Sequence, residues 1–261
     1  MNVRFYGQKA YAGTVEMCQR LGVDVRKLTS MYTRHHHEQL VGVELEVRSA
    51  VLNSTNRFRL YHELRNRTND DLAATFVHEF DQPPIETLAY ELPSHGMPRT
   101  ISIDGDRLAL APPLATVQHL GLDMRIAREI DDEDTLGADH VPPWLGANLI
   151  WGGERAEEHD DWIQTLDDGR QMAFATMESR LWIAGTPSKG TRIQSFGATI
   201  AVEDKITHSM NWSYNLDTGE VLAAFETVNL AFDMVARKAM SIPTHERVSW
   251  EQRLHPELLG D

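Results

Sequence analysis

The chain has 261 residues, of which 41% are hydrophobic and 25% are charged, and its formal net charge is −14. This composition is typical of a folded globular protein with one large or two small domains, and it excludes a disordered chain. The acidic balance argues against sequence-independent binding to nucleic acid and against docking on an anionic membrane, because both need basic surface.

A single cysteine and the lack of a long apolar segment indicate the compartment. Cys18 has no second cysteine with which to form an internal disulfide or a zinc cluster, which favours a reducing environment. No apolar run approaches the roughly 20 residues of a membrane-spanning helix, and residues 1–9 lack the apolar core of a signal peptide. We therefore expect a cytoplasmic protein in which Cys18 is a buried helix residue rather than a nucleophile.

The first predicted elements are a helix and three strands. The helix covers residues 11–21, and Gly22 is a typical stop signal after it. Strands are predicted at residues 44–52, 57–65 and 72–80. Alternation in the second strand places four side chains on one face. These side chains are Phe58, Leu60, His62 and Leu64.

Residues 82–120 are predicted to form an irregular linker, because they contain six prolines. Two short strands are expected inside it, at residues 99–103 and 107–111. A further strand at residues 122–130 and a helix at residues 154–166 follow the linker.

Three C-terminal strands, at residues 192–202, 207–216 and 221–232, repeat the pattern of the first three. The segment Leu72-Ala73-Ala74 matches Leu222-Ala223-Ala224 at a shift of 150, and Phe80-Asp81 matches Phe232-Asp233 at a shift of 152. Each set of strands also follows a helix candidate. The sequence therefore indicates a duplication, with one copy in residues 1–111 and a second in residues 112–261.

The order of a helix followed by antiparallel strands resembles a hot-dog fold. In the first copy the likeness lies in Met1–Tyr6, Tyr32-Thr33-Arg34, Glu38 with Gly42, and residues 58–74. In the second copy it lies in Arg128-Glu129-Ile130, Asp134, Gly137, His140, Pro143, Ala236-Arg237-Lys238 and Ile242-Pro243. These residues resemble the hot-dog thioesterases of the 4-hydroxybenzoyl-CoA thioesterase type, including those fused to carnitine dehydrogenases. The resemblance implies an α+β double hot-dog, in which each copy wraps an antiparallel sheet around a central helix. A tandem also closes a sheet edge that a single copy would leave exposed.

The resemblance also implies a catalytic segment of the form D-x-x-G-H-M, with an Asp and a His before the central helix. In the first copy the chain begins at the Met of this segment, and no strand corresponds to residues 122–130. We expect either that translation starts earlier or that the first copy has lost its motif. In the second copy, Asp134 and Gly137 keep the order of the segment, but two residues intervene before His140.

The resemblance therefore assigns Asp134 as the catalytic carboxylate and His140 as its assistant, with Asp139 as the competing position. The alternative to a catalytic role is an acidic, solvated loop, because residues 131–134 are all acidic. Glu154 is a further catalytic candidate, since some hot-dog enzymes place an acid in the helix after a Gly-Gly pair, and Gly153 is its substrate-binding neighbour.

The remaining substrate-binding candidates are a tyrosine and several basic residues. Tyr6 is expected just before the first helix, where related enzymes can place a Tyr at the thioester; the alternative is a core aromatic. Arginine and lysine side chains suit the phosphates of CoA, although each one can equally be solvated surface charge. These candidates are Arg34, Arg180, Arg237 and Lys238, with Lys189 and Arg192 beside them.

Other chemistries have little support in the sequence. His35 and His37 could reach one ion from one strand face, but no third ligand is indicated, so no metal is predicted. The H-E-x-x-H, G-x-S-x-G, P-loop and G-x-G-x-x-G patterns are absent from the sequence.

We expect an acyl-CoA thioesterase that needs no cofactor beyond the CoA of its substrate. The high negative charge makes an acidic acyl carrier protein a less favourable partner than free CoA. Two other functions stay open: a non-catalytic acyl-CoA-binding protein, and a hot-dog hydratase or dehydratase of enoyl thioesters. Association with further copies of the chain also stays open.

Overall fold

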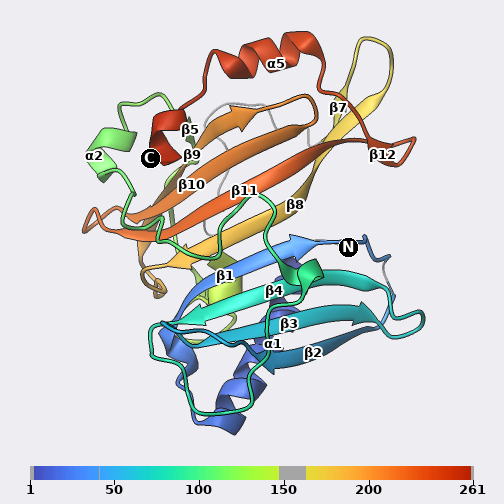
Figure 1. Cartoon of the computed structure of the whole chain (residues 1–261). Helices are drawn as coiled ribbons and strands as arrows, with labels where there is room; N and C mark the ends of the chain where they lie inside the picture. Colours follow the sequence, from blue (N-terminus) through green and yellow to red (C-terminus); the bar gives the residue numbers. More distant parts are fainter. Residues whose placement is uncertain (1–2, 41, 147–162, 260–261) are drawn as a thin grey trace.

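The computed structural model describes residues 3–40, 42–146 and 163–259. One large antiparallel sheet runs through the whole molecule (Figure 1). The first part of the chain contributes α1 (Val3–Leu21), η1 (Val25–Lys27), β1 (Leu28–His35), β2 (Leu45–Val51), β3 (Arg59–Asn66) and β4 (Leu72–Phe80). We call this set copy 1.

The later part of the chain, copy 2, contributes four long strands and several short elements. The long strands are β8 (Gln171–Ile183), β9 (Arg192–Val202), β10 (Ile206–Asn215) and β11 (Val221–Asp233). The short elements are β5 (Asp123–Met124), β6 (Arg128–Glu129), α3 (Asp132–Thr135), η3 (Pro143–Leu145), β7 (Gln164–Thr165), β12 (Lys238–Ala239), α5 (Thr244–Glu251) and η4 (Pro256–Leu259).

The strand order shows that the two copies are arranged symmetrically. It is β2-β3-β4-β1-β8-β11-β10-β9-β5, so β1 and β8 meet at a central seam and each is followed outward by its own copy's strands. Tyr32 of β1 lies opposite Arg180 of β8 in this antiparallel pair. The molecule is therefore an α+β double hot-dog, as the sequence predicted.

The irregularities of the strands repeat as well. The β3–β4 ladder shifts register between Leu64 and Arg65, and the β10–β11 ladder shifts between Ser213 and Tyr214, which are 149 positions further along. The hairpin loops that follow begin at Asn66 and Asn215 with the same backbone hydrogen bonds. The hairpins therefore match at a shift of 149, and not at the shift of 150 that the Leu-Ala-Ala match predicted. The extra residue that a β-bulge inserts makes the true shift hard to read from identities alone.

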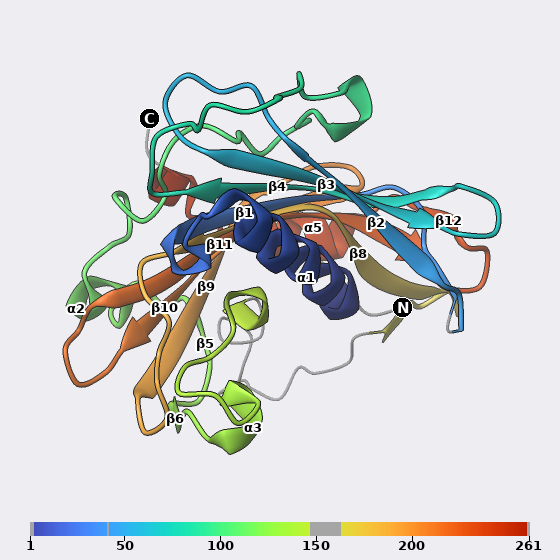
Figure 2. The ribbon, with the colours of Figure 1, turned by 90° about the horizontal axis from the view of Figure 1, so that it is seen from below.

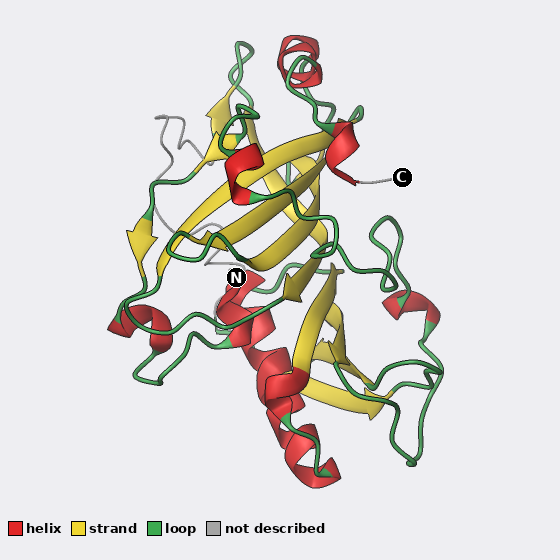
Figure 3. Ribbon diagram, turned by 90° about the vertical axis from the view of Figure 1, so that its left-hand side faces the viewer, coloured by secondary structure: helices red, strands yellow, loops and turns green. Residues whose placement is uncertain are grey.

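Helix α1 lies against one face of the copy 1 strands, whereas η2 (Ser94–Gly96) lies on the opposite side of these strands (Figure 3). A buried stripe at every fourth position turns toward the sheet, as expected for one face of a helix. The stripe consists of Tyr6, Ala10, Thr14 and Cys18, each at most 3% exposed. The helix ends at Gly22, whose φ of 68° suits a glycine.

The linker crosses the other face of the sheet, in front of the strands in Figure 1. It carries η2 and α2 (Leu114–Val117), and Ile101 and Val117 are buried against Tyr32 and Trp182 of the seam strands. The strands predicted at residues 99–103 and 107–111 are wrong, because these residues form bends and turns held down by side chains of the sheet.

Other predicted boundaries also change. Helix α1 begins at Val3 instead of residue 11, and the strand predicted at 122–130 is divided into β5 and β6. Residues 164–165 form β7, so the second predicted helix does not reach residue 166; its earlier part lies outside the described residues. The boundary between the copies at residues 111 and 112 stays a prediction. In the described part of the chain, no helix has the length and apolar content needed to cross a membrane.

Candidate functional site

The acidic segment that the sequence analysis identified forms a short helix whose N-terminus is capped by side chains. The Asp131 carboxylate accepts hydrogen bonds from the backbone N–H groups of Glu133 and Asp134, and the Asp134 carboxylate accepts one from the N–H of Asp131. This reciprocal capping box begins α3. The chain then reverses at Leu136 and Gly137, which have φ values of 53° and 78°.

Asp134 also forms a two-pronged ion pair with Arg128 of β6. The distances are 2.8 Å from Nη1 to Oδ2 and 2.6 Å from Nη2 to Oδ1. Partial burial would raise the pKa of Asp134, but the hydrogen bonds from Arg128 and from the Asp131 backbone outweigh burial and hold the pKa below its ordinary value. A carboxylate offers about four acceptor positions, so the three hydrogen bonds leave about one position free.

His140 and Asp139 follow Asp134 on the same loop. Both side chains are exposed, and the backbone of His140 forms a bridge to Ser188. Among the described residues, no hydrogen bond joins Asp134 to His140. The two candidates Glu154 and Gly153 lie outside the described residues.

The end of this loop packs on the helix of copy 1. Trp144 of η3 touches the core of copy 2 and also the cluster around Cys18 of α1. Its carbonyl oxygen lies 4.0 Å from the place where a Cβ on Gly7 would stand. Figure 2 shows α3 and η3 on the same side of the sheet as α1. The loop that follows α3 therefore reaches the helix of copy 1 through η3.

Tyr6 lies inside α1, and not before the helix as predicted. Its side chain is 3% exposed, its oxygen accepts a hydrogen bond from the N–H of Gln39, and its ring lies 5.8 Å from that of His35. Burial raises the pKa of its hydroxyl, although the Gln39 hydrogen bond opposes the rise. These contacts are those of a core aromatic.

A polar cluster that the sequence did not single out lies between α1 and the sheet of copy 1. The Thr14 hydroxyl is 2.8 Å from Nε2 of His62 and 2.6 Å from Nδ1 of His78. Ser49 Oγ lies 2.7 Å from the other ring nitrogen of His62. The alternation that placed His62 on the face of Leu60 and Leu64 was the available signal, since it marked His62 as buried.

The four predicted phosphate-binding residues have different surroundings. Arg180 is 1% exposed, and its guanidinium donates to Ser30 and to the carbonyl oxygens of Ser102 and Asp104. Burial lowers its pKa to about 10. Its donors are thus engaged inside the protein and are not presented to a ligand at the surface.

The other three phosphate candidates lie nearer to solvent. Arg34 donates to the carbonyl oxygen of Met97 at 2.7 Å. Arg237 pairs with Glu38 of copy 1, and Lys238 is exposed on β12. Arg237 and Lys238 therefore lie together where the two copies meet.

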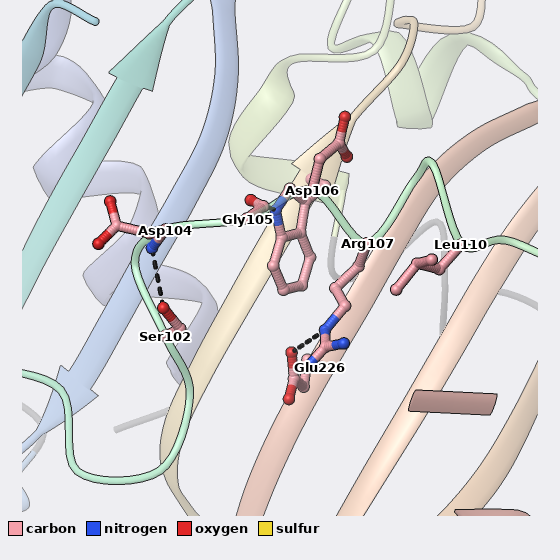
Figure 4. Close-up of a pocket in the computed structure, with 8 residues that line it drawn as sticks. Ser102, Asp104, Gly105, Asp106, Arg107, Leu110 and Glu226 are labelled. Atoms are coloured by element: carbon pink, nitrogen blue, oxygen red, sulfur yellow. Dashed lines mark hydrogen bonds and ion pairs between the residues drawn. The ribbon is translucent and has the colours of Figure 1, made fainter. Parts of the chain in front are cut away.

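A pocket of about 180 Å³ lies under the linker, on the face of the sheet away from α1 (Figure 4). Its floor holds Glu226, which is 2% exposed and accepts hydrogen bonds from Arg107 at 3.3 Å and from His208 at 2.8 Å. Trp182 forms one wall, and its Nε1 donates to the Gly105 carbonyl oxygen. Glu226 is thus already paired with two bases of the protein.

Among the described residues, no group of three or more His, Cys, Asp or Glu side chains is arranged to hold a metal ion. His36 lies 3.4 Å from Thr75 Oγ1, and His37 lies 3.1 Å from the Leu72 carbonyl oxygen. These two histidines are thus held by β4, the neighbouring strand of the sheet.

Comparison with known proteins identifies relatives of the fold only. No family model and no curated protein sequence matches the chain. The 12:0-ACP thioesterase from Umbellularia californica has a similar structure, with a TM-score of 0.59 at 8% identity over 88% of this chain and 87% of that one. An acyl-ACP thioesterase from Bacteroides thetaiotaomicron gives 0.57 at 9% identity, over 88% and 90% of the two chains. A putative oleoyl thioesterase from Lactobacillus plantarum gives 0.51 at 10% identity, over 86% and 82%. At identities this low, these likenesses show a shared fold alone.

Proposed function

We propose that the chain hydrolyses the thioester of an acyl-CoA, releasing a carboxylic acid and CoA. The observation that carries the proposal is the packing of Trp144, at the end of the loop that follows Asp134, against α1 of copy 1, in a double hot-dog whose structural neighbours are described as thioesterases. In thioester hydrolysis a carboxylate can act beside the electropositive N-terminus of a helix.

Asp134 is the proposed group that orients the attacking water. Its lowered pKa keeps it ionised, and its free acceptor position can hold a water proton. Water then adds to the thioester carbon, the C–S bond breaks, and the thiolate of CoA leaves with a proton. We propose that backbone N–H groups at Gly153 receive the carbonyl oxygen, with Glu154 beside them and His140 or Asp139 assisting Asp134.

The exposed cations at the contact between the copies are the proposed place for the CoA phosphates. Arg237 and Lys238 are adjacent there, and Arg237 reaches Glu38 of the other copy. A phosphate would compete with this exposed ion pair at low cost, because exposed pairs contribute at most about 1 kcal/mol.

A second candidate function, binding of an acyl-CoA without hydrolysis, is favoured by the same ion pair that holds Asp134. A carboxylate with three hydrogen bonds and a lowered pKa is a weak base, so it attracts a proton from water poorly.

A thiol-release assay with a panel of acyl-CoAs separates these functions. We expect the wild type to release CoA, and Asp134→Asn to lower kcat by about 100-fold or more, as for loss of a general base. Glu133→Gln is the matched control, because Glu133 is a neighbouring exposed acid on the same helix. Circular dichroism checks that both variants fold.

The other outcomes are equally clear. Saturable CoA-thioester binding without thiol release supports the binding protein, and altered acyl chains without free thiol support a hydratase. A wild type that neither binds nor cleaves any thioester contradicts the proposal. An acyl carrier protein substrate in the same assay tests whether CoA is the preferred carrier.

A further inference from the structure

The two outer edges of the sheet differ in whether further strands pair with them. In copy 2, β5 and β6 pair with the outer side of β9. The Arg125 N–H also donates to the Ser195 carbonyl oxygen, and the Ile130 N–H donates to the Thr191 carbonyl oxygen. In copy 1 the corresponding edge strand is β2, which is the last strand in the order and pairs with β3 alone. No strand among the described residues covers its outer side.

The free backbone groups of β2 can be assigned residue by residue. The Leu52 N–H donates to the Arg59 carbonyl oxygen, and the Glu44 carbonyl oxygen accepts from the Arg67 N–H. The backbone N–H and C=O groups of the even-numbered residues therefore point toward β3. Because the direction of these groups alternates along a strand, the backbone N–H and C=O groups of Leu45, Val47 and Ser49 point away from β3, toward the open edge. The open stretch ends at Val51, whose carbonyl accepts from the Tyr90 N–H at 2.9 Å.

Two charged side chains flank the centre of this open stretch. Glu46 and Arg48 lie on either side of Val47, and their side chains are 45% and 48% exposed. An antiparallel pair of two β2 strands centred on Val47 places Glu46 of each copy opposite Arg48 of the other. Cross-strand pairs of opposite charge stabilise a sheet, and like charges destabilise it.

The charge pattern also selects one register. A slip of two residues in one direction brings Glu46 opposite Glu46, and a slip in the other direction brings Arg48 opposite Arg48. Only the centred register pairs both Glu46 side chains with both Arg48 side chains and leaves no like charges opposite each other; in the first slip Glu44 faces Arg48 while the two Glu46 side chains face each other. It also makes all three outward residues hydrogen-bond partners: Val47 with Val47, and Leu45 with Ser49 in both directions.

We propose that the β2 edge is the docking site for a second copy of this chain, which pairs antiparallel through Leu45–Ser49 about a twofold axis at Val47. The pairing adds a strand to an exposed sheet edge, and its symmetry closes the assembly at two chains. The edge strand β2 and the covered strand β9 lie at opposite ends of the strand order. The interface is therefore separate from the acidic loop, which packs near β9, and the proposal does not depend on the enzymatic one.

Sedimentation equilibrium over a range of concentrations tests the pairing. We expect the wild type to dimerise reversibly and Arg48→Glu to raise the dissociation constant by about tenfold or more, because two opposite-charge pairs become like-charge pairs. The double variant Glu46→Arg with Arg48→Glu should restore dimerisation, since it recreates the pairs with their signs exchanged.

Arg170→Glu is the matched control, because Arg170 also pairs with a nearby acid but lies on the exposed β7–β8 turn of copy 2. It should leave the dissociation constant unchanged. Val47→Pro is a second probe: it removes an outward N–H and spares the β3 ladder, so it should abolish the dimer. A chain that stays monomeric at every soluble concentration overturns the proposal. So does a dimer that Arg48→Glu and Arg170→Glu weaken equally, or one that the double charge exchange does not restore.

Discussion

His62 and His78 are the most unusual residues of copy 1, because both imidazoles are buried without a charged partner. Both are completely excluded from solvent, and their rings lie 4.9 Å apart in an edge-on arrangement. Burial lowers the pKa of His62 to about 3 and that of His78 well below its usual value. The Nε2 atom of His78 has no hydrogen-bond partner. A proton on either ring would be a buried, uncompensated charge.

This burial predicts that the protein loses stability in mild acid. The unfolded histidines bind protons below pH about 6.5, while the folded ones stay neutral until far lower pH. Stability is therefore full above pH 6.5 and falls as the pH drops toward the folded pKa. Each such histidine contributes a slope of about 1.4 kcal/mol per pH unit. Urea unfolding at a series of pH values measures the slope.

A neutral substitute at one histidine should flatten this dependence. We expect His62→Gln to reduce the slope between pH 6 and pH 4 by about one proton, because glutamine does not titrate. His119→Gln is the control, since His119 is exposed and its loss should not change the slope. An unchanged slope in His62→Gln would mean that His62 is protonated in the folded state.

At the scale of elements, the two equivalent hairpin loops both contain a residue with a positive φ, but the residue type differs. The β3–β4 loop places Asp70 at a φ of 61°, and the β10–β11 loop places Gly219 at a φ of 76°. Each donates its N–H to the asparagine that begins the loop. Asp70 remains acceptable because short polar side chains tolerate this conformation and because Arg48 and Arg65 pair with it.

Gly219→Ala is therefore expected to lower the free energy of unfolding by about 1 kcal/mol, the cost of a left-handed backbone for a residue with a Cβ. Gly185→Ala serves as the comparison: Gly185 has ordinary backbone geometry and open space around its Cβ position. Chemical denaturation of both variants measures the difference. Equal effects would show that backbone strain is not the cause.

At the scale of the molecule, the seam joins the copies into one cooperative sheet. Arg180 of β8 reaches Ser30 of β1 and the linker carbonyls, and it lies 3.8 Å from Glu79 of β4. The Glu178 carboxylate accepts hydrogen bonds from Tyr32 and from the linker N–H groups of Arg99 and Thr100. Neither copy can leave the other without exposing these buried charges.

The two copies are therefore expected to unfold in a single transition. All six tryptophans lie at or after residue 144, so their fluorescence reports copy 2, whereas α1, the longest helix among the described residues, contributes helical circular dichroism from copy 1. Denaturation curves from the two signals should coincide. Two separated midpoints would show that the seam does not couple the copies.

Local patterns in the sequence were sufficient to find most strands of both copies. The predictions for β2, β4, β9 and β11 differ from the structure by at most one residue at either end. The seam strands β1 and β8 were missed, because Ser30, Glu178 and Arg180 interrupt the apolar alternation that marks a strand. Those polar residues are buried only because the linker and the other copy cover them.

The repeat of a helix and three strands and the acidic loop were predicted from the spacing of neighbouring residues, and the α+β double hot-dog was predicted from the resemblance that these residues carry. The tertiary structure decided that Asp134 is tied to Arg128, that Arg180 is internal, and that β2 keeps an open edge. The physical reason is that strand pairing and ion pairing join residues distant in the chain. The environment of a charge, and with it the chemistry that the charge can perform, therefore depends on partners that local spacing does not reveal.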